Sequence, residues 1–318
     1  MPVIAGYVLL FAGTGYRVLL GSGCFLFLIL GYLGSRTHYL AAQLLRGSRH
    51  PAKTVSVAYA VGLLLQFLNH NLLWGETVEG SFLAGSFVML WVLTVGMAQN
   101  ALPGYHRRQK AEDRETVPVK NAQEGVTAEQ ISWKNPRLAG VALLVTVVLM
   151  TCIFATLDNA VTLAHAAGTM DIGQWPRVLL ACSGLAAGFL FDLHDRRFMN
   201  LIMYCIMMLS TLSVAILQLG GSFLIGLIVF YLSSGFFVVF FTTSFLALSE
   251  DTRCPRLWAG MGRAVNNAGA ALVSNLSLSL IASNSSITLI ITALLLFATV
   301  SILIAAYSML KEPGVQTE

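Results

Sequence analysis

The chain has 318 residues, of which 56% are hydrophobic and only 11% are charged. Its mean hydropathy is +0.74. An ordinary soluble domain carries charge on about a quarter of its residues, so this composition excludes a soluble globular protein of this length. The chain is therefore expected to be an integral membrane protein.

Apolar runs of roughly 20 residues follow one another along the chain, which is the length that an α-helix needs to cross about 30 Å of hydrocarbon. Barrel strands would be shorter and would alternate polar with apolar residues. The runs predict an all-α, polytopic membrane protein with about nine transmembrane helices, at about 8–34, 54–74, 81–101, 138–157, 176–193, 199–219, 222–248, 262–282 and 286–309. Gly13 and Gly15 leave open whether the first run is one helix or two.

Lysine and arginine residues are distributed unevenly between the two sides of these predicted spans. Only Arg17 and Arg177 of the 19 basic residues lie outside one set of alternate loops. The positive-inside rule places that set in the cytoplasm, together with the loop 103–136 and the C-terminus. The N-terminus is then external, and the expected location is the cell (plasma or inner) membrane, with the lipid bilayer as a partner.

One long polar stretch, residues 103–136, divides the chain and holds about half of its charged residues. Its composition predicts a cytoplasmic linker. Before it, residues 1–102 supply about three spans, a partial N-terminal bundle; after it, residues 137–310 supply a six-helix bundle, followed by a cytoplasmic tail at 311–318. Six spans after a central loop equal one half of a transporter that is built from two three-span repeats.

A dense group of charges interrupts the apolar sequence at AGFLFDLHDRRFM, residues 186–198. Its spacing, G-x-L-x-D-x-x-x-R-R, resembles the signature loop of the major facilitator superfamily and is formed by Gly188, Leu190, Asp192, Arg196 and Arg197. In that family the loop lies on the cytoplasmic side between the second and third spans of each half. The motif falls between the second and third spans after the linker in this chain.

The charges of this motif suit a gate. A carboxylate at a helix end, with arginines one turn on, can bridge to a neighbouring helix terminus and hold a cytoplasmic gate closed. We therefore expect Gly188, Asp192, Arg196 and Arg197 to form a gating motif. The alternative is that Arg196 and Arg197 only set the topology and that Asp192 is a solvated helix end.

A shorter motif lies near the N-terminus, where RVLLGSG, residues 17–23, has the R-x-x-x-G-x-G order of the family's fourth-span motif. The resemblance makes the first span equivalent to the fourth of twelve. It implies that three spans are missing and that the chain alone does not transport unless those spans, or a homodimer, complete the first bundle. Arg17 is then a candidate functional residue; if its helix begins near Gly15, it is an interfacial anchor instead.

Polar residues within the spans are candidates for binding a substrate or a coupling ion. Gln66, Asn69 and His70 stand at i, i+3 and i+4 and share one helix face, which must point at protein or at a water-filled cavity. Asn267 and Asn275 make the eighth span similarly polar. The alternatives are interhelical hydrogen bonds for the first group and close helix packing for the second.

Two functional classes follow from these features. The first is an MFS-like secondary transporter that moves an unidentified small solute by alternating access. The second is a membrane sensor related to LuxR-type regulators, without its DNA-binding part, so that this chain binds no nucleic acid. An enzyme is disfavoured because no nucleotide loop, nucleophile elbow or zinc signature is present, and no cofactor or metal is expected.

Overall fold

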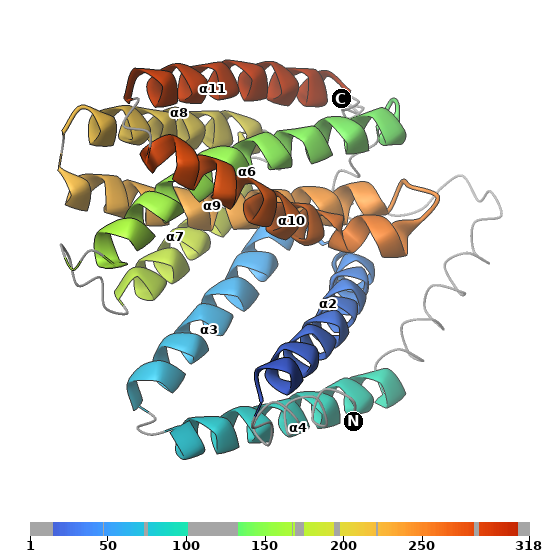
Figure 1. The fold of residues 1–318 in the computed structure, drawn as a ribbon. Helices are drawn as coiled ribbons and strands as arrows, with labels where there is room; N and C mark the ends of the chain where they lie inside the picture. The colour runs from blue at the N-terminus through green and yellow to red at the C-terminus, as the bar shows by residue number, and fades with distance from the viewer. Residues whose placement is uncertain are drawn as a thin grey trace, which may run out of the picture. The chain divides into compact units, whose positions relative to one another are not determined.

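The structure is a computed structural model, and it describes residues 15–46, 48–72, 76–100, 133–166, 168, 175–193, 198–220, 222–282 and 286–310. The regular elements in these ranges are α-helices, as the sequence predicts (Figure 1). They are α2 (Tyr16–Leu45), α3 (Pro51–Leu72), α4 (Glu76–Asn100), α6 (Pro136–Ala166), α7 (Trp175–Phe191), α8 (Met199–Gln218), α9 (Phe223–Ser249), α10 (Pro255–Ala282) and α11 (Ser286–Met309).

Six helices in the described part of the chain are long and apolar enough to cross a membrane, by length and composition, namely α2, α3, α6, α8, α9 and α11. This agrees with a helical, multi-pass membrane protein. The remaining helices, α4, α7 and α10, do not meet this criterion over their described residues; α7 has only 17 residues, and α10 contains polar side chains such as Asn266 and Asn267. The count of nine spans therefore stays a prediction.

Several helices extend beyond the apolar runs that predicted them, and α6 does so by ending at Ala166 instead of about residue 157. α2 ends at Leu45 instead of about residue 34, and α10 begins at Pro255 instead of about residue 262. The added turns of α2 and α10 pack together, because Ala42 and Ala259 are buried in one cluster with Leu246 of α9. A basic residue expected in a loop, Arg36, consequently lies inside α2.

Proline starts three of the helices, since Pro51, Pro136 and Pro255 are the first residues of α3, α6 and α10. Proline suits this position because the first N–H of a helix has no partner within the helix. The start of α6 is capped locally, because the side-chain oxygen of Asn135 accepts a hydrogen bond from the backbone N–H of Leu138 at 3.2 Å. The N-cap position of α3 is occupied by His50, which is not one of the preferred capping residues, so α3 lacks such a local cap.

The helices form two compact units, and the boundary between the units falls inside α2 and α3. The first unit contains Met1–Leu33 and Leu68–Thr127, and the second contains Gly34–Phe67 and Ala128–Glu318. In the first unit, Leu26 of α2 is buried against Ala84 and Phe87 of α4. The second unit holds the large core and the features described below.

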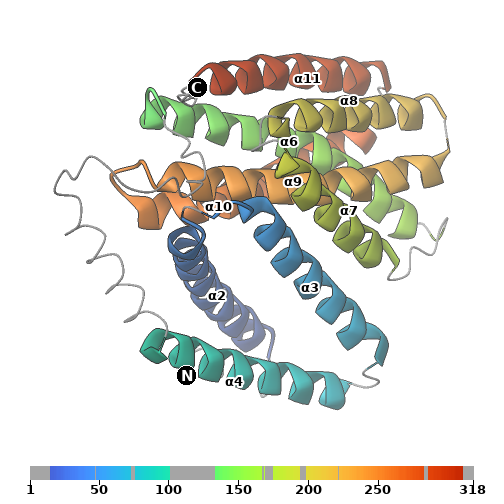
Figure 2. The same ribbon diagram turned by 180° about the vertical axis from the view of Figure 1, so that it is seen from behind.

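α9 lies at the centre of the second unit, in contact with α6, α7, α8 and α10 (Figures 1 and 2). It is apolar all round, as a helix surrounded by other helices should be. Phe240, Phe241 and Phe245 of α9 are almost completely buried. α11 contacts α6 and α8, so these two helices separate it from α9.

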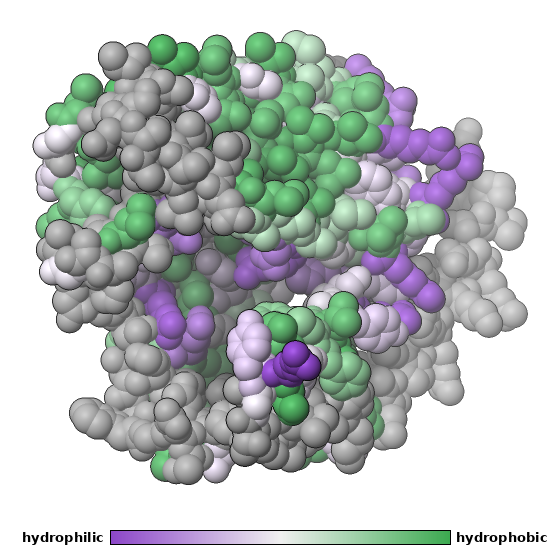
Figure 3. Space-filling view, in the orientation of Figure 1, coloured by the Kyte–Doolittle hydropathy of each residue, from purple (hydrophilic) through white to green (hydrophobic). Residues whose placement is uncertain are grey.

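Large apolar side chains are exposed on the outside of the second unit, where the hydropathy surface shows a broad hydrophobic area (Figure 3). They include Leu201, Met208 and Leu212 of α8 and Leu294, Leu295 and Ile302 of α11. Extensive exposed apolar surfaces are unusual on soluble monomers and suit contact with lipid. Hydrophilic side chains gather at the end where α6 begins and α9 ends (Figure 3).

Candidate functional site

Asp192 caps the first turn of α3. It directly follows Phe191, the last residue of α7, and only 8% of its surface is exposed. One carboxylate oxygen accepts a hydrogen bond from the backbone N–H of Ala52 at 3.3 Å, and the other accepts one from Lys53 at 2.7 Å. These are the N–H groups of the second and third residues of α3, which an N-cap side chain normally satisfies. The carboxylate also interacts favourably with the positive end of the helix dipole.

Glycines on α7 allow α3 to come close enough for this cap. A Cβ atom on Gly188, one turn before Asp192, would collide with the hydroxyl of Ser56 and lie 2.8 Å from the carbonyl oxygen of Ala52. A Cβ atom on Gly184, one turn earlier still, would lie 2.7 Å from the ring of Tyr59. Gly184, Gly188 and Asp192 therefore form one stripe at intervals of four residues, and this stripe faces the first turns of α3.

Lys53 adds a further contact between the same two helices. Its ammonium nitrogen lies 5.3 Å from the ring centroid of Phe189 on α7, within the range of a cation–π interaction. The backbone N–H of Lys53 donates to Asp192 while its side chain covers Phe189, so one residue joins α3 to α7 twice.

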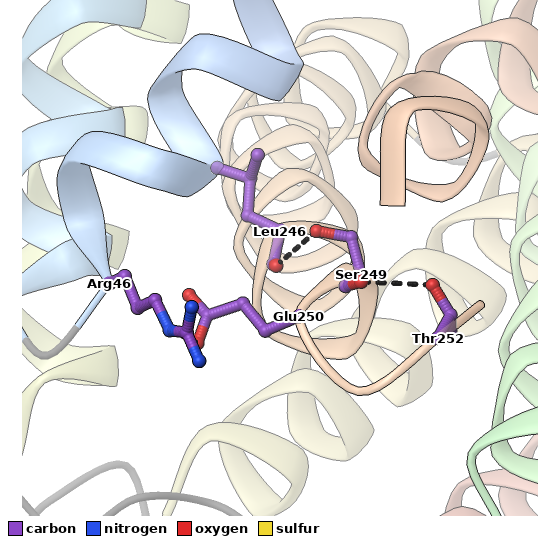
Figure 4. Close-up of polar contacts among 5 residues, drawn as sticks. All are labelled: Arg46, Leu246, Ser249, Glu250 and Thr252. Carbon is purple, nitrogen blue, oxygen red and sulfur yellow. Dashed lines mark hydrogen bonds and ion pairs between the residues drawn. The ribbon is translucent and has the colours of Figure 1, made fainter. Parts of the chain in front are cut away.

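The end of α2 meets the end of α9 in a second polar contact (Figure 4). The guanidinium of Arg46 lies 3.9 Å from the carboxylate of Glu250, at the limit of an ion pair. α9 ends with its last carbonyls satisfied, because the Ser249 hydroxyl donates to Leu246 O at 2.7 Å and the Thr252 hydroxyl donates to Ser249 O at 2.9 Å (Figure 4). The cation of Arg46 therefore faces an acidic, ordered helix end.

Two further charged residues lie in or beside this turn. The guanidinium of Arg256 lies 5.5 Å from the ring centroid of Tyr39 on α2. Partial burial raises the pKa of the Asp251 carboxyl, and Arg46 opposes this shift. We call this end of the second unit the basic end, defined by Arg46, Lys53, Asp192, Glu250 and Arg256.

The structure brings some of the predicted gating residues to one place. Gly188 and Asp192 both face α3, as a bridge to a neighbouring helix terminus requires. Arg196 and Arg197 lie outside the described residues. Sequence reasoning missed Gly184, Ser56 and the identity of the partner helix. The spacing Gly184-x-x-x-Gly188 was the available signal, because small residues at this interval allow close helix packing in membranes.

The candidate binding residues belong to three helices, α2, α3 and α10. Arg17 lies in the first turn of α2 and is exposed, which is the position of the interfacial-anchor alternative. Gln66 is exposed, and its backbone carbonyl accepts a hydrogen bond from Arg177 at 3.4 Å. Asn69 and His70 belong to α3, but their side chains are outside the described part of the structure.

In α10, Asn267 is exposed, and the side chain of Asn275 is outside the described part. The neighbouring Asn266 amide lies 2.9 Å from the Thr151 hydroxyl of α6, so Asn266 joins two helices by a hydrogen bond. Among the described residues, no group of three His, Cys, Asp or Glu side chains is arranged to hold a metal ion.

No protein-family model matches the chain, and no curated protein matches it. The resemblance to the major facilitator superfamily therefore depends on the residues given above.

Proposed function

We propose that the chain is a secondary transporter of the major-facilitator type, which moves a small solute by alternating access between two sides of a membrane. The observation that carries the proposal is the carboxylate of Asp192, which closes on the backbone N–H groups of Ala52 and Lys53 at the basic end. In the proposed cycle this bond holds α3 against α7 when the cytoplasmic side is closed, and it breaks when that side opens.

The strength of this contact suits a reversible gate. A hydrogen bond to a charged group contributes about 1.5–3 kcal/mol. Removal of an N-cap side chain typically costs about 1 kcal/mol, so we expect a net contribution of this order. A contact of this size biases a conformational equilibrium without locking it, and loss of one partner shifts the populations measurably. Arg196 and Arg197 are proposed to strengthen the closed state.

Thiol labelling tests the gate. Ser56 is fully buried where Gly188 faces it, whereas its neighbour Val57 is exposed. In a chain whose five free cysteines are replaced by serine, we expect the thiol introduced by Ser56→Cys to react slowly with a water-soluble maleimide. Adding Asp192→Asn should increase that rate several-fold, while the rate at Val57→Cys, the matched control, should stay the same. Equal rates at Ser56→Cys with and without Asp192→Asn would contradict the gate.

A second position distinguishes transport from sensing. Gln66 is exposed on α3 and lies about 15 Å farther along the helix than Ser56, at 1.5 Å per residue. Alternating access predicts that Asp192→Asn lowers the labelling rate at Gln66→Cys as it raises the rate at Ser56→Cys. A rise at the basic end with no change at Gln66→Cys would favour a sensor that opens on one side only.

A further inference from the structure

A pocket of about 380 Å³ lies among α2, α3, α9 and α10 in the second unit, and Asp192 is not among its lining residues. This volume is within the range of small-molecule sites. Its walls are mainly apolar, with alanine, leucine and valine side chains from α2, α3 and α9. The pocket is lined by Thr37, His38, Ala41, Leu45, Thr54, Val55, Ala58, Tyr59, Val238, Thr242, Leu246 and Arg263.

Each of the four helices supplies at least one polar group to this apolar space: His38 from α2, Tyr59 from α3, Thr242 from α9 and Arg263 from α10. Within the described part of the chain, the side chains of Tyr59, Thr242 and Arg263 make no hydrogen bond or ion pair. A few convergent polar groups in an apolar pocket are the usual arrangement of a ligand site. Tyr59 and Thr242 are partly buried, where an unpaired polar group is costly and a ligand that pairs with it is stabilised, whereas the Arg263 side chain is exposed at the mouth of the pocket.

Arg263 gives the pocket a permanent positive charge. It lies eight residues into α10, about 12 Å from the start of the helix, so it is not a charge of the connecting turn. Among the described residues, no aspartate or glutamate lines the pocket, and Tyr59 lines it together with this guanidinium. A guanidinium is always protonated and presents paired N–H donors that match a carboxylate.

His38 has one ring nitrogen already engaged. Its Nδ1 lies 2.7 Å from the carbonyl oxygen of Gly34, one turn earlier in α2, and must donate its proton to that acceptor. In the neutral ring the other nitrogen, Nε2, is then an acceptor, so it suits a donor group of a ligand and not its carboxylate. The imidazole is held in place by this backbone bond, so its position in the pocket is fixed before a ligand arrives.

We propose that this pocket binds a small organic anion with a single carboxylate on an apolar body, such as a simple aromatic or short aliphatic acid. The carboxylate pairs with Arg263 and reaches the Tyr59 hydroxyl, and the apolar body packs against Val55, Val238 and Leu246. This inference goes beyond the proposed gate and does not depend on it, because the site exists whether the ligand is carried or only bound.

The pocket does not suit two other kinds of anion. Inorganic phosphate has no apolar surface to bury against these walls, and it would need more cationic partners than one arginine to offset the loss of its hydration. The acyl chain of a membrane lipid is larger than the 380 Å³ of the pocket, so most of the chain would lie outside it. Size, single charge and apolar surface together therefore define the ligand class.

Benzoate is the probe that tests the assignment, with benzamide as a neutral compound of the same shape and inorganic phosphate as a compact anion. Binding is measured by saturation-transfer NMR and by the shift in thermal unfolding of the full chain in detergent. We expect benzoate to bind on the order of millimolar, as weak fragments do, and benzamide and phosphate to bind at least about tenfold more weakly.

Three variants identify the pocket. Arg263→Gln should weaken benzoate binding at least about tenfold through loss of the charged pair. Ala58→Phe, which fills the cavity and keeps the charge, should abolish it. Arg256→Gln, on the same helix but stacked on Tyr39 outside the pocket, should leave it unchanged. The proposal would be overturned if Arg263→Gln bound benzoate as tightly as the parent chain does. It would also be overturned if the parent chain bound benzamide or phosphate as tightly as benzoate, or if Arg256→Gln weakened benzoate binding as much as Arg263→Gln does.

Discussion

Gly188 and Asp192 lie one helical turn apart on the same face of α7, and both meet the first turns of α3: Gly188 leaves the space, and Asp192 supplies the cap. A small side chain at the first position is thus required for the hydrogen bonds at the second. The motif G-x-L-x-D gains a physical explanation from this relationship, because its glycine and its aspartate act on the same neighbouring helix.

Replacing Gly188 by alanine should therefore disturb the cap. The added methyl group would collide with Ser56 and the backbone of Ala52, and overpacking of this kind costs about 1–3 kcal/mol. We expect lower resistance to unfolding by dodecyl sulfate in detergent. Gly62→Ala is the matched control, since nothing lies within 4 Å of that position on α3 and alanine favours the helix there. Equal stability of the two variants would show that α3 and α7 do not touch at Gly188.

The cap itself is tested by Asp192→Ala. Removal of an N-cap carboxylate leaves two N–H groups of α3 without an acceptor and should lower the free energy of unfolding by about 0.5–2 kcal/mol. Asp192→Asn retains one acceptor oxygen and should cost less. Ser222→Ala serves as the control, because Ser222 occupies the N-cap position of α9 without making a side-chain cap bond. A larger loss at Ser222 than at Asp192 is incompatible with the cap.

The sequence predicted an all-helical membrane protein, but not the partner of Asp192. The hydrogen-bonded groups of Ala52 and Asp192 are 140 residues apart, and apolar runs contain no information on which helix ends meet. Helix ends were also misplaced, because α2 continues to Leu45 by packing Ala42 against α9 and α10, after the strongly apolar run has ended. Hydropathy marks the part of a helix that suits lipid, and tertiary packing determines where the helix stops.

Adjacent polar residues in α10 illustrate the same point. Asn266 and Asn267 are equivalent by composition, yet only Asn266 lies against Thr151. Interhelical hydrogen bonds in membranes contribute about 0.6 kcal/mol on average. We expect Asn266→Ala to destabilise the chain by about this amount and Asn267→Ala to have no measurable effect on unfolding. The reverse order would mean that Asn267, not Asn266, joins the helices.

The pKa of Asp251 predicts a pH dependence at the basic end. Partial desolvation raises the pKa of this carboxyl above its unfolded value, so the protonated form is favoured by folding. Its contribution to stability is present below the unfolded pKa and is lost as pH rises through the folded pKa. Asp251→Asn should therefore raise the free energy of unfolding at neutral pH by a few tenths of a kcal/mol, and this gain should vanish near pH 3. A gain that is constant with pH would contradict the shift.

The distance between the start of α3 and the end of α7 tests the gate most directly. Spin labels at Val57→Cys and Leu193→Cys, both exposed positions, report this distance by double electron–electron resonance in a chain without its native cysteines. We predict one short distance in the parent chain and a second, longer population when Asp192→Ala is added, because loss of the cap lets α3 leave α7. An unchanged distance distribution in Asp192→Ala would show that Asp192 does not hold the gate.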